Sequence, residues 1–190
     1  MIKWMRTLIV ALAILAFSVT AAFAEAKIIV KTDFTTAKYY KVSFKSTDAK
    51  IISGQLPSGW SDNSDWNAEI AVSYTATQED GVTFLSMDKS SGGRAQLANN
   101  ISKKQVLGTY RFVMELRSTT SSIPEIGIRL SGEPYTFLWS TQPKLGDDWE
   151  TIDEEFDIDP DGKPIGIYIC IPENGILDIK SVRLEQIAVG

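Results

Sequence analysis

Carboxylates and aromatic rings are the side chains of this sequence that could do chemistry, because its 190 residues include no histidine and a single cysteine. Ser-His-Asp and Cys-His nucleophilic systems, histidine-ligated zinc and histidine acid–base catalysis are therefore excluded. The 19 basic residues are outnumbered by 24 acidic ones, and the net charge of -5 argues against sequence-independent nucleic-acid binding, which needs a basic surface. Carboxylate chemistry and non-catalytic binding remain.

One run of alternating acids precedes a glycine-containing turn. Asp157, Asp159 and Asp161 match the first half of an Asp-x-Asp-x-Asp-Gly calcium loop, in which alternating oxygens converge on one cation. The twelfth position of such a loop would be Tyr168 instead of a bidentate acid, so an acidic turn is the alternative interpretation. A structural calcium is a hypothesis here, and no other cofactor is expected.

The same run offers a carboxylate pattern for glycan cleavage, since Glu155, Asp157 and Asp159 resemble the acidic strand of laminarinase-type jelly-roll glucanases. Residues two apart on a strand are separated by ~6.7 Å and residues four apart by ~13 Å. Retaining glycosidases hold their carboxyl groups ~5 to 5.5 Å apart and inverting ones ~6.5 to 9.5 Å apart. Only neighbouring members of the triplet, or a bulged strand, fit these distances. Pro160 indicates that the strand ends here, away from the middle of a cleft. We therefore expect a protein that is not an enzyme, and a small glycan hydrolase or lyase is the less favoured alternative.

Aromatic side chains are the second group, because sugar rings stack on Trp and Tyr while their hydroxyls bond to polar groups. Trp60 and Trp66 lie in a polar segment, GWSDNSDWN, where two large rings are hard to hide together. We expect an exposed pair that binds ligand. The alternative is that one or both rings fold back and cover an end of the domain.

The first 24 residues have the features of a secretory signal. Lys3 and Arg6 precede an apolar stretch shorter than the ~20 residues that span a membrane, and Ala22-Phe23-Ala24 supplies a small-residue cleavage site. We predict cleavage after this triplet, a single domain over residues 25–190 with no membrane span, and a secreted or periplasmic location. Cys170 has no partner for an internal disulfide and is expected to be partly buried in a strand, with intermolecular pairing or a reactive thiol as the alternative.

Period-two alternation recurs along the rest of the chain, and no window shows a convincing helical period. It is strongest over 110–116, 126–130 and 165–171, with turn signals such as Asp80-Gly81 and Asn174-Gly175 between the alternating segments. Weaker alternation occurs over 38–44, 50–53, 69–77, 82–87, 94–101, 135–139, 150–158 and 176–187. Closely spaced short strands without crossover helices predict an all-β fold, an antiparallel β-sandwich of jelly-roll type.

The pleat of these strands assigns polar side chains to an outer face. If the apolar residues of the first segment point inward, Glu115 and Arg117 turn outward, and the same rule turns Arg129 and Tyr168 outward from their own strands. With Trp139, these residues are expected to share a concave outer surface that suits a polyol ligand. The alternative is a solvated face with cross-strand ion pairs.

Five segments together resemble parts of one known family. They are the tryptophan loop 54–60, the strand entered at Asp80-Gly81, the strand that opens Gly108-Thr109-Tyr110-Arg111-Phe112, the segment from Trp149 to Phe156, and the closing strand 175–185. The family is the galactose-binding-like jelly-roll carbohydrate-binding modules appended to bacterial xylanases and glucanases. The resemblance implies a calcium held by acids near the first and last strands. The sequence departs from this pattern, because Thr35 and Lys180 replace the acids expected there.

The resemblance and the aromatic residues together predict a secreted, non-catalytic module that binds a polysaccharide or oligosaccharide. The residues expected to stack on sugar are Trp60, Trp66, Trp139 and Tyr168, and those expected to make polar contacts are Glu115, Arg117 and Arg129. The alternative partner is a protein at the cell surface, since Trp, Tyr and Arg also dominate protein interfaces.

Overall fold

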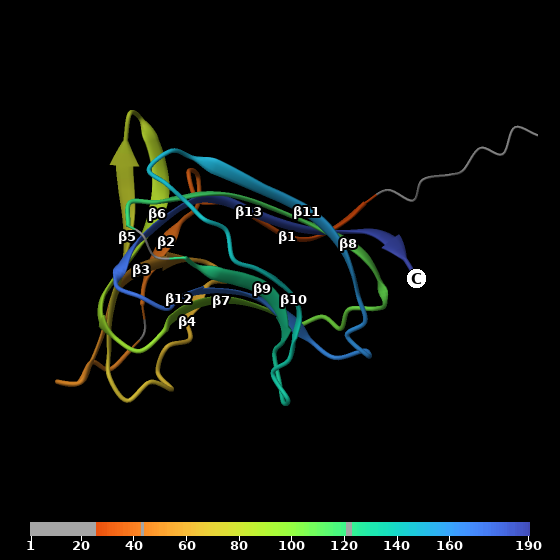
Figure 1. Cartoon of the computed structure of the whole chain (residues 1–190), viewed down its shortest axis with the longest axis horizontal. Helices are drawn as coiled ribbons and strands as arrows, with labels where there is room; N and C mark the ends of the chain where they lie inside the picture. Colours follow the sequence, from red (N-terminus) through yellow and green to blue (C-terminus); the bar gives the residue numbers. More distant parts are fainter. Residues whose placement is uncertain (1–25, 43, 121–122) are drawn as a thin grey trace, which may run out of the picture.

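The computed structural model describes residues 26–42, 44–120 and 123–190, and within these ranges it contains strands and no helix (Figure 1). The predicted signal, residues 1–24, lies outside the described residues. No helix of the described ranges is long and apolar enough to cross a membrane. The all-β prediction is confirmed.

The strands form two sheets, which we call the large sheet and the small sheet. The large sheet has eight strands: β1 (Lys27–Asp33), β2 (Tyr39–Lys41), β3 (Lys50–Pro57), β5 (Ile70–Glu79), β6 (Val82–Gly92), β8 (Gly108–Ser118), β11 (Glu150–Ile158) and β13 (Gly175–Val189). The small sheet has five strands: β4 (Ser61–Asp62), β7 (Ala95–Ile101), β9 (Glu125–Leu130), β10 (Phe137–Thr141) and β12 (Ile165–Ile171). The spatial orders are β11-β8-β13-β6-β5-β3-β2, with β1 also on β13, and β10-β9-β12-β7-β4.

The two sheets lie face to face as the layers of a jelly-roll β-sandwich, as predicted (Figure 1). Neighbouring strands are antiparallel except for β3 and β5, which pair in parallel. Between these two strands the chain crosses to the small sheet and forms β4 before it returns. That detour supplies the long connection that a parallel pair needs.

The core between the sheets follows from strict alternation. On β8, Tyr110, Phe112, Met114 and Leu116 are fully buried, as the period-two pattern predicts. The isoleucines of β9 and β12 complete the core from the small sheet. Cys170 is also buried and unpaired, which confirms its predicted place in a strand.

Two strands were not predicted from the sequence. In β1 the pairing with β13 shifts register between Ile28 and Val30, so the exposure pattern of this strand is irregular. The other, β4, is only two residues long, which is too short to show a period. The bulge hides the alternation of β1, and the shortness of β4 leaves no alternation to detect.

Candidate functional site

The outer surface predicted to unite Glu115, Arg117, Arg129 and Tyr168 does not exist. Glu115 and Arg117 lie on β8 of the large sheet, whereas Arg129 and Tyr168 lie on β9 and β12 of the small sheet. Because the core lies between the sheets, their outer faces point away from each other (Figure 1). Alternation along each strand correctly predicted that these side chains face outward, but it carries no information on which strands belong to the same sheet.

Trp139, the fifth member of the predicted surface, lies between the sheets at one edge of the sandwich. Its ring stacks on Phe156 of β11 with the centroids 4.2 Å apart and the planes at 9°, and it also packs on Phe112 at 5.4 Å. Half-buried against the core, Trp139 does not face outward with Arg129. Register explains the error, because a bulge between Phe137 and Trp139 switches the face to which the tryptophan points.

The tryptophan pair of the polar segment is split. Trp60 is 6% exposed, lies 5.5 Å from the ring of Phe34, and donates a hydrogen bond from Nε1 to Oγ1 of Thr32 at 3.0 Å. Trp66 is 61% exposed. The expectation of two exposed rings is therefore wrong for Trp60, whose ring closes the sandwich, and is confirmed for Trp66.

A hollow of about 410 Å³ lies on the outer face of the small sheet, and we call it the small-sheet hollow. Its lining consists of Asn63, Trp66, Gln96, Arg129 and Tyr135. The loop that leads into β5 carries Trp66, and the loop between β9 and β10 carries Tyr135; both loops extend from the small sheet on the side away from the large sheet (Figure 1). The hollow thus has one exposed aromatic ring on each of its two loops.

A stack of aromatic rings around Arg129 forms part of this hollow. The guanidinium carbon lies 3.7 Å from the ring centroid of Tyr168, which is 2% exposed, and 5.4 Å and 5.8 Å from the rings of Tyr135 and Phe137. The hydroxyl of Tyr168 donates to Oδ1 of Asn100 at 2.7 Å. Tyr168 therefore supports Arg129 from below, and its covered ring is not itself free to stack on a ligand.

Two glycines let these large side chains lie flat on the sheet. In the β9–β12 register, Gly127 is opposite Tyr168 and Gly166 is opposite Arg129. A Cβ on Gly166 would lie 2.8 Å from Cε2 of Tyr168, and one on Gly127 would lie 2.7 Å from Cδ1 of Phe137. Each glycine thus leaves room for the ring beside it.

The loop that carries Trp66 is fixed by buried polar contacts. The side chain of Asn67 donates to the carbonyl oxygens of Ser64 and Arg94 at 2.7 and 2.8 Å. Ser64 in turn donates through its N–H and Oγ to the carboxylate of Asp62 at 2.9 and 2.8 Å. Such a fixed loop presents its aromatic ring at a low entropic cost of binding.

The inner end of this loop is anchored on a buried phenol and carboxylate. The hydroxyl of Tyr74 donates to Oδ2 of Asp62. Burial raises the pKa of the Asp62 carboxyl, and burial together with the neighbouring Asp62 charge raises the pKa of the Tyr74 phenol well above its ordinary value. Neither Asp62 nor Tyr74 lines the small-sheet hollow, so their role is to anchor the loop.

Two amides complete the polar lining. The side chain of Asn63 donates from Nδ2 to Oε1 of Gln96, and Gln96 donates from Nε2 to Sγ of Cys170 at 3.0 Å. Burial raises the pKa of the Cys170 thiol, so it is held as a neutral acceptor beneath the hollow. The arrangement leaves the Oδ1 atom of Asn63 available as an acceptor for a ligand hydroxyl.

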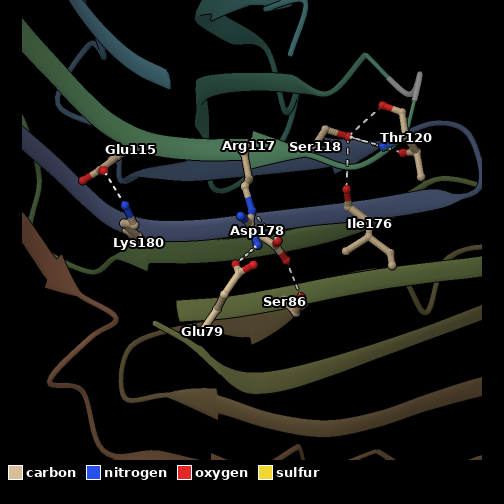
Figure 2. A network of polar contacts seen from close by, with 9 residues as sticks. All are labelled: Glu79, Ser86, Glu115, Arg117, Ser118, Thr120, Ile176, Asp178 and Lys180. Carbon is tan, nitrogen blue, oxygen red and sulfur yellow. Dashed lines mark hydrogen bonds and ion pairs between the residues drawn. The ribbon is translucent and has the colours of Figure 1, made fainter. Parts of the chain in front are cut away.

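Arg117 has a different environment on the outer face of the large sheet. Figure 2 shows it reaching from β8 across β13 toward Asp178 and Glu79. Nε donates to Oδ2 of Asp178 at 2.9 Å and Nη2 donates to Glu79, while Ser86 donates to the other oxygen of Asp178. Asp178 is 3% exposed, so Arg117 neutralises a buried carboxylate.

Two further cation contacts surround Trp149 beside this cluster. Arg117 lies 4.7 Å and Lys180 4.0 Å from the ring centroid of Trp149, which forms a T-shaped contact with Phe84 at a centroid distance of 5.2 Å. Nζ of Lys180 also bonds to Glu115 at 2.8 Å (Figure 2). Both polar residues predicted on β8 are thus engaged in ion pairs, which matches the alternative interpretation of a sheet face with cross-strand pairing.

The acids of the calcium and glycanase hypotheses bond to different groups. Asp157 accepts a hydrogen bond from Thr109 at 2.6 Å, Oδ1 of Asp159 accepts the N–H of Asp161 at 2.9 Å, and Asp161 lies 3.5 Å from Lys163. Within the described ranges, no group of three acidic or cysteine side chains is placed to hold a metal ion. The calcium loop stays a prediction from the sequence.

Glu155, the remaining acid of the glycanase pattern, is exposed on β11, which is an edge strand of the large sheet. Neither Glu155 nor Asp157 lines the small-sheet hollow, the hollow beside Arg117 and Trp149, or the hollow beside Tyr40. A second hollow of about 300 Å³ lies at the end of the sandwich, where Tyr40 is 58% exposed. Within the described residues, the small-sheet hollow combines exposed rings, amides and a cation.

Four residues around the hollow were not predicted from the sequence: Asn63, Gln96, Tyr135 and Phe137. The sequence does carry a signal for the floor of the hollow, because Gly127-Ile128-Arg129 and Gly166-Ile167-Tyr168 share a glycine two residues before a large outward side chain. On paired strands this spacing makes a shallow floor with large groups lying across it.

Comparisons with known proteins agree with this architecture. No protein-family model matches the sequence, and no curated protein matches it. Among solved structures, the CBM22-1 xylan-binding domain of Xyn10C from Paenibacillus barcinonensis has a TM-score of 0.56 at 8% identity, over 87% of this chain and 97% of that one. A putative sugar binding protein from Bacteroides thetaiotaomicron has a TM-score of 0.56 at 14% identity, over 84% of this chain and 100% of that one.

A third structure, described as a CBM4 structure, has a TM-score of 0.55 at 16% identity, over 67% of this chain and 86% of that one. The solved structures that resemble the chain are thus mostly jelly-roll carbohydrate-binding modules, as the sequence resemblance predicted. At these identities the likeness establishes the jelly-roll fold. Ligand and activity have to be argued from the site itself.

Proposed function

We propose that the chain is a non-catalytic carbohydrate-binding module whose ligand, a polysaccharide or oligosaccharide, lies in the small-sheet hollow. One observation carries the proposal: two exposed rings, Trp66 and Tyr135, flank the Arg129 guanidinium and two amides in one hollow. Pyranose rings present apolar faces to aromatic rings and hydroxyls to amides and guanidinium groups. A volume of about 410 Å³ falls in the range of small-molecule sites, large enough for a short saccharide segment.

The similar solved structures support this proposal. One is a xylan-binding domain and another a putative sugar binding protein. The loop that carries Trp66 is braced by the buried Asn67 and Ser64, as expected for a surface that binds without rearranging. The alternative is that the same rings bind a protein partner at the cell surface.

Affinity electrophoresis through a panel of polysaccharides tests the proposal. The wild-type chain should be retarded by at least one polysaccharide, and Trp66→Ala and Tyr135→Ala should each weaken binding about tenfold or more, the equivalent of roughly 1.4 kcal/mol. Both side chains are more than half exposed, so their removal should leave the fold intact.

Tyr40→Ala is the matched control. Tyr40 is also an exposed ring, but it lines the hollow at the end of the sandwich. This variant should keep wild-type retardation. Loss of binding in Tyr40→Ala with full binding in Trp66→Ala would move the site to that end, and no retardation by any polysaccharide would reject the sugar proposal.

The proposal includes binding without cleavage. Glu155 and Asp157 lie on an exposed edge strand outside the described hollows, where no substrate would be held for an acid and a base to act together. Incubation with the same polysaccharides should release no reducing ends. Release that disappears in Asp157→Asn would show a glycan hydrolase or lyase instead.

We also infer that the protein is exported, as its signal-like first 24 residues indicate. N-terminal sequencing of the protein recovered from its native source tests this inference. Glu25 should be the first residue, and an intact Met1 would contradict it.

A further inference from the structure

Arg129 lacks the partners that every other described arginine has. Arg94, Arg111, Arg117 and Arg183 each lie within ion-pair distance of a carboxylate. Among the described residues, no ion pair and no side-chain hydrogen bond involves the guanidinium of Arg129, and its Nε is buried without a partner. A half-buried guanidinium with five unused donors is costly unless something outside the chain bonds to it.

The surroundings of Arg129 favour an anion. Arg129 is the one charged residue in the lining of the small-sheet hollow, which contains no carboxylate. Tyr168 covers one face of the guanidinium and Tyr135 and Phe137 lie near it, so water is partly excluded around the charge. An ion pair formed there is screened less than one on an open surface.

The guanidinium also has a reachable edge. Nε is covered, whereas neither Nη atom is bonded to a described residue, and Arg129 lines the hollow, so an acceptor that enters the hollow can reach these donors. A carboxylate takes two parallel hydrogen bonds from a guanidinium, and these charge-assisted bonds are about twice as strong as neutral ones. A sugar hydroxyl accepts only a neutral-type bond from the same group.

We propose that the small-sheet hollow selects acidic saccharides, with Arg129 binding the carboxylate of a uronic acid residue while Trp66 and Tyr135 stack on sugar rings. This inference rests on the proposed function and adds the chemical class of the ligand. It runs against the net charge of -5, which by itself would repel a polyanion. The discrimination must therefore come from the local cation, since charges beyond the Debye length of ~10 Å are largely screened at 0.1 M salt.

Pairs of polymers that differ only in their carboxylates give a direct test. The probes are polygalacturonate, alginate and glucuronoxylan, each compared with its carboxyl-reduced form by isothermal titration calorimetry on the full-length mature protein. Wild-type protein should bind at least one uronate polymer about tenfold or more tighter than its reduced form. This preference should persist at 0.1 M salt, because a partly enclosed ion pair is screened less than one on an open surface.

Variants connect this preference to Arg129. Arg129→Gln should abolish the difference between the paired polymers, and Arg129→Lys, which keeps the charge but loses the planar fork, should retain part of it. Arg111→Gln removes one charge from the outer face of the large sheet and should leave the preference unchanged. Trp66→Ala should weaken both members of a pair equally, because stacking does not depend on the carboxylate.

The outcomes separate this inference from the proposed function. Equal binding of paired polymers, or a uronate preference that survives in Arg129→Gln, would overturn the inference and leave carbohydrate binding intact. Retention only by neutral glycans outside the three pairs would do the same. Failure to bind any polysaccharide would overturn both.

Discussion

Arg117 and Arg129 both point outward from strands of the sandwich and both lie on aromatic rings, but only Arg117 is paired with carboxylates of the described residues. Arg117 bonds to Asp178 and Glu79 on the large sheet, whereas Arg129 has no carboxylate partner among the described residues. Their cation–π contacts are similar, at 4.7 Å from Trp149 and 3.7 Å from Tyr168. An arginine beside aromatic rings is thus no sign of a ligand site by itself; the donors left unused are what distinguish the two.

Removal of Arg117 should have the largest effect on stability. Arg117→Met leaves Asp178, 3% exposed, as a buried carboxylate without its cation, and we expect the free energy of unfolding to fall by about 3 kcal/mol. For a domain of this size the Tm should drop by about 6 to 12 °C, measured by calorimetry. Arg129→Met should change stability by less than about 1 kcal/mol, because loss of the cation–π contact is offset by removal of the unpartnered Nε.

A double variant checks the cause. Arg117→Met with Asp178→Asn should recover part of the lost stability, since the uncompensated charge is gone. Equal destabilisation by Arg117→Met and Arg129→Met would contradict the distinction between a structural and a ligand-binding arginine.

The next largest effect is expected from filling the floor of the small-sheet hollow. Gly166→Ala places a Cβ 2.8 Å from Cε2 of Tyr168 and 3.0 Å from the backbone oxygen of Asn99. We expect a loss of about 1 to 3 kcal/mol in the free energy of unfolding. Polysaccharide binding should weaken as well, because Tyr168 supports Arg129.

Gly132→Ala is the matched control, since a Cβ there meets nothing within 4 Å. It lies in the loop between β9 and β10 and should leave both stability and binding close to wild type. Full stability and binding in Gly166→Ala would show that the flat packing of Tyr168 is not what holds Arg129 in place.

The sequence predicted the sandwich well and the site only in parts. Alternation on β8 and β12 assigned the core correctly because the pleat fixes which side chains share a face of one strand. Strand order is decided by long-range pairing that leaves no local pattern, so Arg117 and Arg129 were placed on one surface when they lie on two. Trp60 was misplaced because its polar sequence context does not reveal that the loop folds back onto the core. Trp139 was misplaced because the alternation of its strand does not reveal the bulge before it.

A smaller effect should come from the hydroxyl of Tyr168. Tyr168→Phe removes the 2.7 Å hydrogen bond to Oδ1 of Asn100 and should cost about 1 kcal/mol of stability. Ligand binding should be unchanged, because the ring under Arg129 remains. Chemical denaturation and calorimetric titration of the same sample measure the two effects. A large loss of binding would show that the hydroxyl itself, or Asn100, contacts the ligand.

The smallest expected effect is a difference between variants in the reaction rate of the Cys170 thiol. This rate reports whether the floor beneath Arg129 opens. Burial raises the pKa of this thiol, and Gln96 lies against its sulfur at 3.0 Å, so the native protein should react with a thiol reagent far more slowly at pH 8 than the unfolded chain does. Arg117→Met should speed the reaction only in proportion to its lower global stability, since Arg117 is on the other sheet. Gly166→Ala should speed it further than its stability loss accounts for, because the disturbance is local to the small sheet. If the two variants speed the thiol reaction equally at matched stability, both sheets open in the same global unfolding event. The floor of the hollow would then have no local opening of its own.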